Sequence, residues 1–206
     1  MAKTSRILSA RRRVLRIGID FDNTIACYDR VWRKVAMEGK LVSGDFVGGK
    51  AEIRAAVRAA GDGETNWRRL QGRIYGKHMH EAQLMEGVDD FLNNCRRHGH
   101  CVFIVSHKTE YGHFDPERIN LRRAAFEWME GRGFFDGGGY AIDRGNVFFE
   151  STREEKLDRI RSLNLDHFID DLAEVLENPG FPEGPERHRY AANWPRIMGR
   201  VFGDAV

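Results

Sequence analysis

The stretch VLRIGIDFDNT (residues 14–24) decides the fold of this 206-residue chain. Its first seven residues are mostly apolar and β-branched, which predicts a buried strand over Val14–Asp20. The strand stops abruptly at an acidic, loop-like segment. Two carboxylates, those of Asp20 and Asp22, are therefore expected at the C-terminal end of the first strand.

Short apolar runs and helical patterns alternate along much of the remaining chain. Further strands are predicted over residues 101–106, 147–149 and 167–170, and near 189–192. Helices are predicted over residues 88–97, 116–131 (started by proline), 153–163 and near 195–202. Strands separated by helices favour an α/β fold with a Rossmann-like parallel sheet flanked by helices, in which ligands bind beyond the carboxyl ends of the strands.

One segment interrupts this alternation. Residues 28–83 show three successive helical patterns, which glycine-rich breaks at 43–49 and 61–63 separate. We therefore expect a small helical insertion over 28–83 after the first strand. The catalytic core would comprise residues 1–27 and 84–206.

Charge is nearly balanced over the whole chain, with 33 basic against 31 acidic residues and a net charge of +2. No strong overall field draws the molecule to nucleic acid or to an anionic membrane, so nucleic-acid binding is not expected. The N-terminus is locally basic, however, and the first nineteen residues contain no acid. Its arginines are Arg6, Arg11, Arg12, Arg13 and Arg16. We interpret residues 1–13 as a flexible, solvated basic tail, although an organelle presequence or a nucleic-acid arm has a similar composition.

Hydropathy and cysteine content indicate the cellular environment. No stretch approaches the ~18 apolar residues of a membrane span, and no apolar run of the secretory type follows the basic start. The three cysteines fit no paired zinc-ligand spacing, which suits free thiols in a reducing compartment. These features predict a soluble, cytoplasmic protein without membrane contact.

Polar side chains follow three of the predicted strands at their C-terminal ends. They are Asp20 with Asp22, Ser106, and Asp170 with Asp171. Because the carboxyl ends of parallel strands share one edge of a sheet, these side chains are expected to form one site.

This ordered set resembles the four motifs of the haloacid dehalogenase (HAD) superfamily. Asp20-Phe21-Asp22-Asn23-Thr24 is similar to its Asp-x-Asp-x-Thr motif, and Ser106 matches the Ser or Thr that ends a later strand. Lys156 matches the lysine near the start of a helix, and Asp170-Asp171 the final acidic pair. The resemblance spans residues 14–178, and the insertion lies where this superfamily has its helical cap.

The resemblance implies a Mg²⁺-dependent phosphatase. Asp20 would be the nucleophile that forms an aspartyl-phosphate, and Asp22 the general acid and base. Ser106 would donate to a phosphate oxygen, while Lys156 offsets the negative charge. Mg²⁺ would be held by Asp20, the Asp22 carbonyl and Asp171, with Asp170 acting through water, although either acid of the pair could be the direct ligand.

Other residues near these motifs are candidates for substrate binding. They are Asn23, Thr24, Arg73, Tyr75, His107 and Lys108, of which Thr24 is expected mainly to brace its loop. The partner would be a small phosphate ester. The runs RIGIDFDNTI, FIVSHKT and HFIDD are similar to uncharacterised members found among bacterial surface-carbohydrate genes, which suggests a sugar phosphate.

Several alternatives stay open on sequence grounds. A phosphoryl transferase or mutase would share the first half-reaction, and a nucleotide phosphatase could stack a base on Trp32, Trp67 or Tyr75 unless these form the cap core. A non-catalytic protein with the same fold could use the arginine-rich tail on nucleic acid. Segment 44–51 nearly fits a nucleotide-binding P-loop, but Ala51 replaces the required hydroxyl, so we interpret it as a loop that begins a cap helix. The oligomeric state cannot be predicted from the sequence.

Overall fold

The computed structural model describes residues 13–203, and most of the predicted basic tail lies outside that range. Five parallel strands form the central sheet in the order β5-β4-β1-β6-β7. Their bounds are β1 (Arg16–Ile19), β4 (Cys101–His107), β5 (Val147–Glu150), β6 (His167–Asp170) and β7 (Glu186–Arg189). The parallel α/β sheet predicted from the sequence is confirmed.

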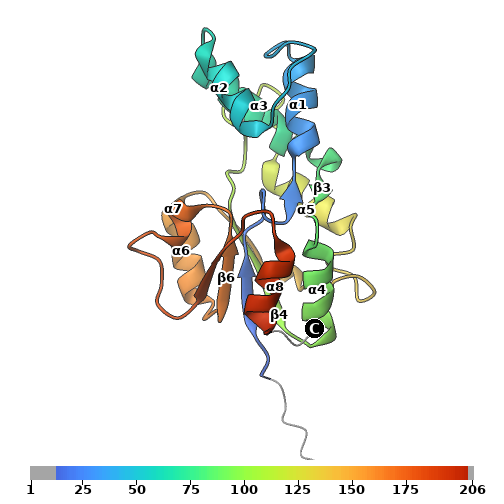
Figure 1. Cartoon of the computed structure of the whole chain (residues 1–206), viewed down its shortest axis with the longest axis vertical. Coiled ribbons are helices and arrows are strands. Elements are labelled where there is room, and N and C mark those ends of the chain that lie inside the picture. Colours follow the sequence, from blue (N-terminus) through green and yellow to red (C-terminus); the bar gives the residue numbers. More distant parts are fainter. Residues whose placement is uncertain (1–12, 204–206) are drawn as a thin grey trace, which may run out of the picture.

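Helices cover both faces of this sheet (Figure 1). One face carries α4 (Val88–Arg97) and α8 (Trp194–Phe202), and the other carries α6 (Arg153–Ser162) and the short α7 (Ala173–Leu176). Strand alternation explains the two hydrophobic layers: Ile104 belongs to the cluster that includes α4 and α8, whereas its neighbours Phe103 and Val105 belong to the cluster with α6.

Glycine is required at the centre of β1. A Cβ atom on Gly18 would lie 2.5 Å from Leu165 Cδ1 and 2.6 Å from Phe168 Cδ2. The absent side chain therefore lets Phe168 of β6 fill the core beside β1, the strand that directly precedes Asp20.

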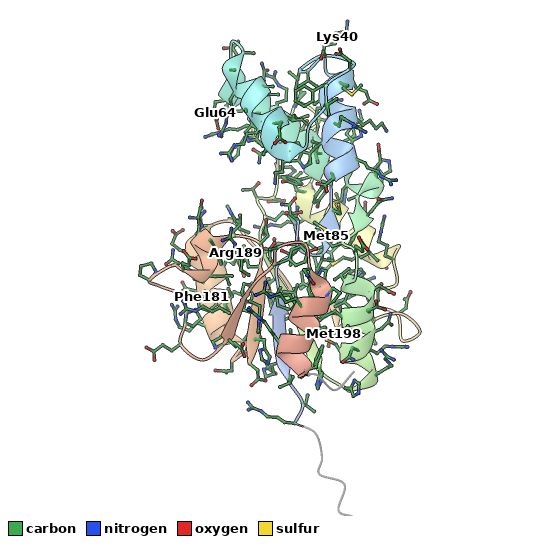
Figure 2. All side chains as sticks on the ribbon, viewed as in Figure 1. Lys40, Glu64, Met85, Phe181, Arg189 and Met198 are labelled. Atoms are coloured by element: carbon green, nitrogen blue, oxygen red, sulfur yellow. The ribbon has the colours of Figure 1, made fainter. Side chains whose placement is uncertain are left out.

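The segment after β1 forms a separate helical layer beyond the carboxyl edge of the sheet (Figure 1). It contains α1 (Asp29–Glu38), α2 (Lys50–Ala59), α3 (Gly63–Tyr75) and the 3₁₀ turn η1 (Met79–Glu81). The short antiparallel strands β2 (Ala26–Cys27) and β3 (Gln83–Leu84) pair at its two ends. Lys40 lies at the end of this layer farthest from the sheet, whereas Met85 lies near its base (Figure 2). We refer to residues 28–83 as the cap.

The cap packs against the core through α5 (Leu121–Glu130) and the loop that precedes it. The Trp128 indole N–H donates to the Ala82 carbonyl at 2.8 Å. A Cβ on Gly112 would lie 2.5 Å from the Gly72 Cα, so only glycine allows the loop to approach α3 this closely. One hydrophobic cluster also continues from the sheet into the cap.

Two predicted elements differ from the expected bounds by more than two residues. The helix after β4 begins at Leu121 rather than at 116, because the Asn120 side chain caps it by accepting the Arg123 N–H at 2.9 Å. Pro116 lies in a turn that precedes Asn120, the N-terminal capping residue of α5.

The last strand spans Glu186–Arg189 rather than 189–192. It is an edge strand with the polar sequence ERHR, so its apolar pattern is weak. Across residues 13–203, no helix is both long and apolar enough to cross a membrane.

Candidate active site

A tight turn after β1 presents the first two aspartates. The Asp20 N–H donates to the Ile169 carbonyl at 2.8 Å, which continues the sheet by one residue. Phe21 is fully buried and its carbonyl accepts the N–H groups of Ile25 and Ala26, both at 2.9 Å. Asn23 has a φ of 62°, a left-handed conformation that asparagine tolerates better than most residues. The chain thus reverses within a few residues and leaves both carboxylates at the sheet edge.

Lys156 joins two of the motif carboxylates. Its ammonium group lies 2.6 Å from Asp20 Oδ1 and 2.6 Å from Asp170 Oδ2, and the side chain is 1% exposed. Ser106 at the end of β4 donates its hydroxyl to the same Asp20 oxygen at 3.0 Å. Burial lowers the pKa of Lys156, but the two carboxylates outweigh it and raise the pKa above its ordinary value. The lysine is therefore charged.

Three carboxylates around this lysine could hold a cation. Ligand atoms of Asp20, Asp170 and Asp171 all lie within 4.8 Å of one another. Burial raises the pKa of Asp20 to about 7 despite Lys156, with Asp170 and Asp171 adding to the rise. Burial, followed by the charge of Asp170, raises the pKa of Asp171 to about 6.

When ionised, these carboxylates carry three negative charges beside the single positive charge of Lys156. A hard divalent cation with oxygen ligands fits this donor set. Asp170 already accepts Lys156 on Oδ2 and the Leu172 N–H on Oδ1, which favours Asp171 as the direct ligand of the acidic pair.

Asp22 belongs to a second network, on the cap side of the site. Its carboxylate accepts the Tyr28 hydroxyl on Oδ1, and the Lys108 ammonium lies 2.8 Å from Oδ2. Lys108 is 3% exposed and lies over the rings of Tyr75 and Phe21, at 5.0 and 5.6 Å from their centroids. The network fixes Asp22 with one residue from the cap and one from the end of β4.

Two cavities meet at this pair of networks. The first, of about 220 Å³, is lined by the motif residues Asp20, Asp22, Ser106, Lys156 and Asp171 and by residues of the cap. The second, of about 210 Å³, lies between α3 and the loop after β4. Both are lined by Asp22, Gln71, Tyr75 and His107. Each is smaller than the ~300 Å³ at the lower end for sites of drug-sized ligands, so they suit a small substrate.

Four of the six predicted substrate-binding residues line a cavity, and two do not. Asn23 lines the first cavity, Lys108 the second, and Tyr75 and His107 line both. Thr24 is fully buried and Arg73 is part of α3, and neither lines either cavity. The burial of Thr24 agrees with its expected role in bracing the loop, and Arg73 is not placed at either cavity.

Trp32 and Trp67 also lie away from the cavities. Their rings stack on each other at 4.8 Å, and both are buried. They form the core of the cap, which is one of the two alternatives that the sequence left open.

Several cavity residues were not predicted. Lys50, Gln71 and Arg153 line the first cavity, and Arg68 and His113 line the second. Lys50 lies in the glycine-rich segment 44–51, which we interpreted as a loop before a cap helix rather than as a P-loop. Its position at the start of that helix was the one sequence feature that could have marked it as a site residue. For the others, helical periodicity alone does not distinguish a cavity-facing from a solvent-facing polar residue.

Comparison with known proteins identifies the fold. No protein-family model and no curated protein matches the chain. A HAD-superfamily hydrolase from Ehrlichia chaffeensis has a similar structure with a TM-score of 0.51 at 15% identity, covering 92% of this chain and 97% of that one. A hydrolase from Streptococcus pneumoniae TIGR4 has a TM-score of 0.56 at 13% identity, covering 91% and 98%.

A haloacid dehalogenase-like hydrolase from Streptococcus pneumoniae has a TM-score of 0.52 at 11% identity, also covering 91% of this chain and 98% of that one. Similarity at these identities defines the fold and leaves the reaction to be argued from the site. The chain has the haloacid dehalogenase-like fold.

Proposed function

We propose that this protein is a Mg²⁺-dependent phosphomonoester hydrolase with Asp20 as its nucleophile. The observation that carries the proposal is the environment of Asp20. Its carboxylate accepts hydrogen bonds from the Lys156 ammonium group at 2.6 Å and from the Ser106 hydroxyl at 3.0 Å. Asp20 also lines the same cavity as Asp22 and Asp171. A nucleophile, an acid, a cation-binding set and fixed donors are the parts that phosphoryl transfer requires.

The donors around Asp20 leave one oxygen for the reaction. Lys156 and Ser106 both bind Oδ1, and Oδ2 accepts no hydrogen bond from the described residues. Asp20 would attack phosphorus, forming an O–P bond while the bond from phosphorus to the ester oxygen breaks. The same lysine and serine lie beside the place where negative charge collects on the phosphoryl oxygens.

Asp22 would move the proton. It gives a proton to the departing ester oxygen, then takes one from the water that attacks phosphorus and releases phosphate from Asp20. Tyr28 and Lys108 hold the Asp22 carboxylate from two sides, so its position is fixed by charge and hydrogen bonding. Asp20, the Asp22 carbonyl and Asp171 would hold Mg²⁺, with Asp170 acting through water. When bound, the ion supplies positive charge to the phosphoryl oxygens.

The cavities support a small phosphorylated metabolite as substrate, such as a sugar phosphate. A nucleotide is less well supported, because Trp32 and Trp67 are buried against each other and only Tyr75, of the three aromatic candidates for base stacking, lines the cavities. A link to surface-carbohydrate genes remains an expectation from the sequence. A cytoplasmic location also remains a proposal.

A panel assay tests the hydrolase directly. Phosphate release would be measured from sugar phosphates, nucleotides and p-nitrophenyl phosphate, with Mg²⁺ and with EDTA. We expect release that requires Mg²⁺ and is lost in Asp20→Asn. Conversion of a sugar phosphate to an isomer without free phosphate would instead establish the transferase or mutase. No turnover of any ester would overturn the proposal.

A further inference from the structure

Lys50 brings a positive charge from the cap to the cavity that contains the motif residues. It is the first residue of α2 and lines the same cavity as Asp20, Ser106 and Lys156. In sequence it follows the glycines of the P-loop-like segment, but the Gly49 N–H donates to Glu52 Oε2 at 2.9 Å. The backbone N–H that precedes the helix is therefore already hydrogen-bonded and does not point freely into the cavity. The side chain of Lys50 is therefore the part of this segment that is available to the cavity.

Lys50 differs from the other cations of the two cavities in having no carboxylate partner. Among the residues that the structure describes, no carboxylate oxygen lies within 4.0 Å of its ammonium group. The other four cations all have such a partner. They are Arg68 with Glu64, Lys108 with Asp22, Arg153 with Glu174, and Lys156 with Asp20 and Asp170.

Neutral groups hold the Lys50 ammonium in place. It lies 3.3 Å from the Tyr75 hydroxyl and 5.3 Å from the centre of the Trp32 ring. Burial lowers the pKa of this lysine, although the more distant charges of Asp22 and Asp171 oppose the effect. A partly buried charge without a counter-ion is unfavourable, so an anion that enters the cavity would relieve that cost.

We propose that Lys50 binds the phosphoryl group of the substrate from the cap, on the side away from Lys156. This inference rests on the proposed function, since it requires that the cavity takes a phosphate ester. Lys156 is paired directly with two carboxylates, whereas Lys50 has only more distant negative charges near it, such as those of Asp22 and Asp171, so Lys50 is the freer cation to attract a dianion. Because Lys50 belongs to α2, phosphate binding would also link the cap to the core.

The test measures the binding of inorganic phosphate, which does not depend on turnover. Calorimetric titrations with Mg²⁺ present would compare the native chain with Lys50→Met, which keeps an apolar stem without the charge. Lys34→Met is the matched control, because Lys34 is also on the cap but pairs with Glu81 at 2.8 Å and lines neither cavity. We expect at least a tenfold weaker affinity for phosphate in Lys50→Met, native affinity in Lys34→Met, and partial recovery in Lys50→Arg.

Thermal stability separates binding from a structural role. Loss of an unpaired, partly buried charge should leave the melting temperature of Lys50→Met equal to or above the native value. Native phosphate affinity in Lys50→Met would overturn the inference, and so would weaker binding accompanied by a lower melting temperature in both Lys50 variants. Phosphate binding that depends on Lys50 in a protein that cleaves no ester would contradict the hydrolase alone. Ester cleavage with native phosphate affinity in Lys50→Met would contradict only the role of Lys50.

Discussion

Replacement of Lys156 by methionine removes the cation that lies 2.6 Å from both Asp20 and Asp170. The three side chains are at most 7% exposed, so the remaining carboxylates would face each other with little water between them. Breaking a buried ion pair in this way costs about 3–5 kcal/mol of unfolding free energy. That is a large share of the ~5–15 kcal/mol by which domains are stable.

Urea unfolding in the presence of EDTA would measure this loss. With a slope of about 1–3 kcal/mol per molar urea, we expect the midpoint of Lys156→Met to fall by roughly 2 M. Lys77→Met is the matched control, because Lys77 pairs with Glu117 at 2.8 Å on the surface, with side chains 48% and 41% exposed. Its loss should cost less than about 1 kcal/mol.

A double variant tests the electrostatic origin of the loss. Asp170→Asn keeps the oxygen that can accept the Leu172 N–H, which now lies 2.8 Å from Oδ1, but removes one of the buried charges. Lys156→Met with Asp170→Asn should therefore be more stable than Lys156→Met alone. If Lys156→Met costs no more than Lys77→Met, or if the second change lowers stability further, the reasoning about a buried charge cluster is refuted.

Three further outcomes follow from the site and from the sheet edge. Asp22→Asn should lower kcat/KM for sugar phosphates by about 10²–10⁴-fold but lower it less for p-nitrophenyl phosphate, because nitrophenolate needs little protonation and kcat/KM reports the step in which the leaving group departs; equal losses of kcat/KM would argue against Asp22 as the acid. Mg²⁺ should raise the melting temperature of the native chain, and Asp171→Asn should reduce this rise; an undiminished rise in that variant would remove Asp171 from the ligand set. Burial, only partly opposed by Glu186, lowers the pKa of His188 to about 4. The unfolded chain, in which this histidine has its ordinary pKa of 6.5, therefore binds a proton at a higher pH than the native state does. Stability should thus fall by about 2 kcal/mol from pH 7 to pH 5, and urea titrations of His188→Phe should show a smaller fall unless other groups cause it.

The sequence predicted the central sheet well because buried parallel strands are short apolar runs with clear ends. The strand at residues 167–170 and the helix at 88–97 have the predicted bounds. The edge strand β7 was misplaced because its sequence ERHR lacks an apolar run. The helix start at Leu121 was missed because Pro116 suggested an earlier first turn, whereas Asn120 provides the cap. At this helix, the side-chain cap from Asn120 determined the start, and the general preference of proline for the first helical turn did not.

The motif residues were predictable because each lies at or just after the end of a strand, or near the start of a helix, and sheet topology then brings them together. The cap residues were less predictable because they depend on tertiary packing. Arg73 and Gln71 are both on α3, yet only Gln71 lines the cavities. Lys50 was dismissed with the P-loop, although the structure places it beside Tyr75 at the motif cavity.

Chemical trapping of the covalent intermediate is the most direct test of the central claim. The enzyme would be mixed with p-nitrophenyl phosphate and Mg²⁺, quenched during turnover, and reduced with borohydride, which converts an aspartyl-phosphate to homoserine. We expect peptide mass spectrometry to find homoserine at position 20, only when substrate is present. Turnover with unmodified Asp20, or with homoserine at another aspartate, would contradict the account.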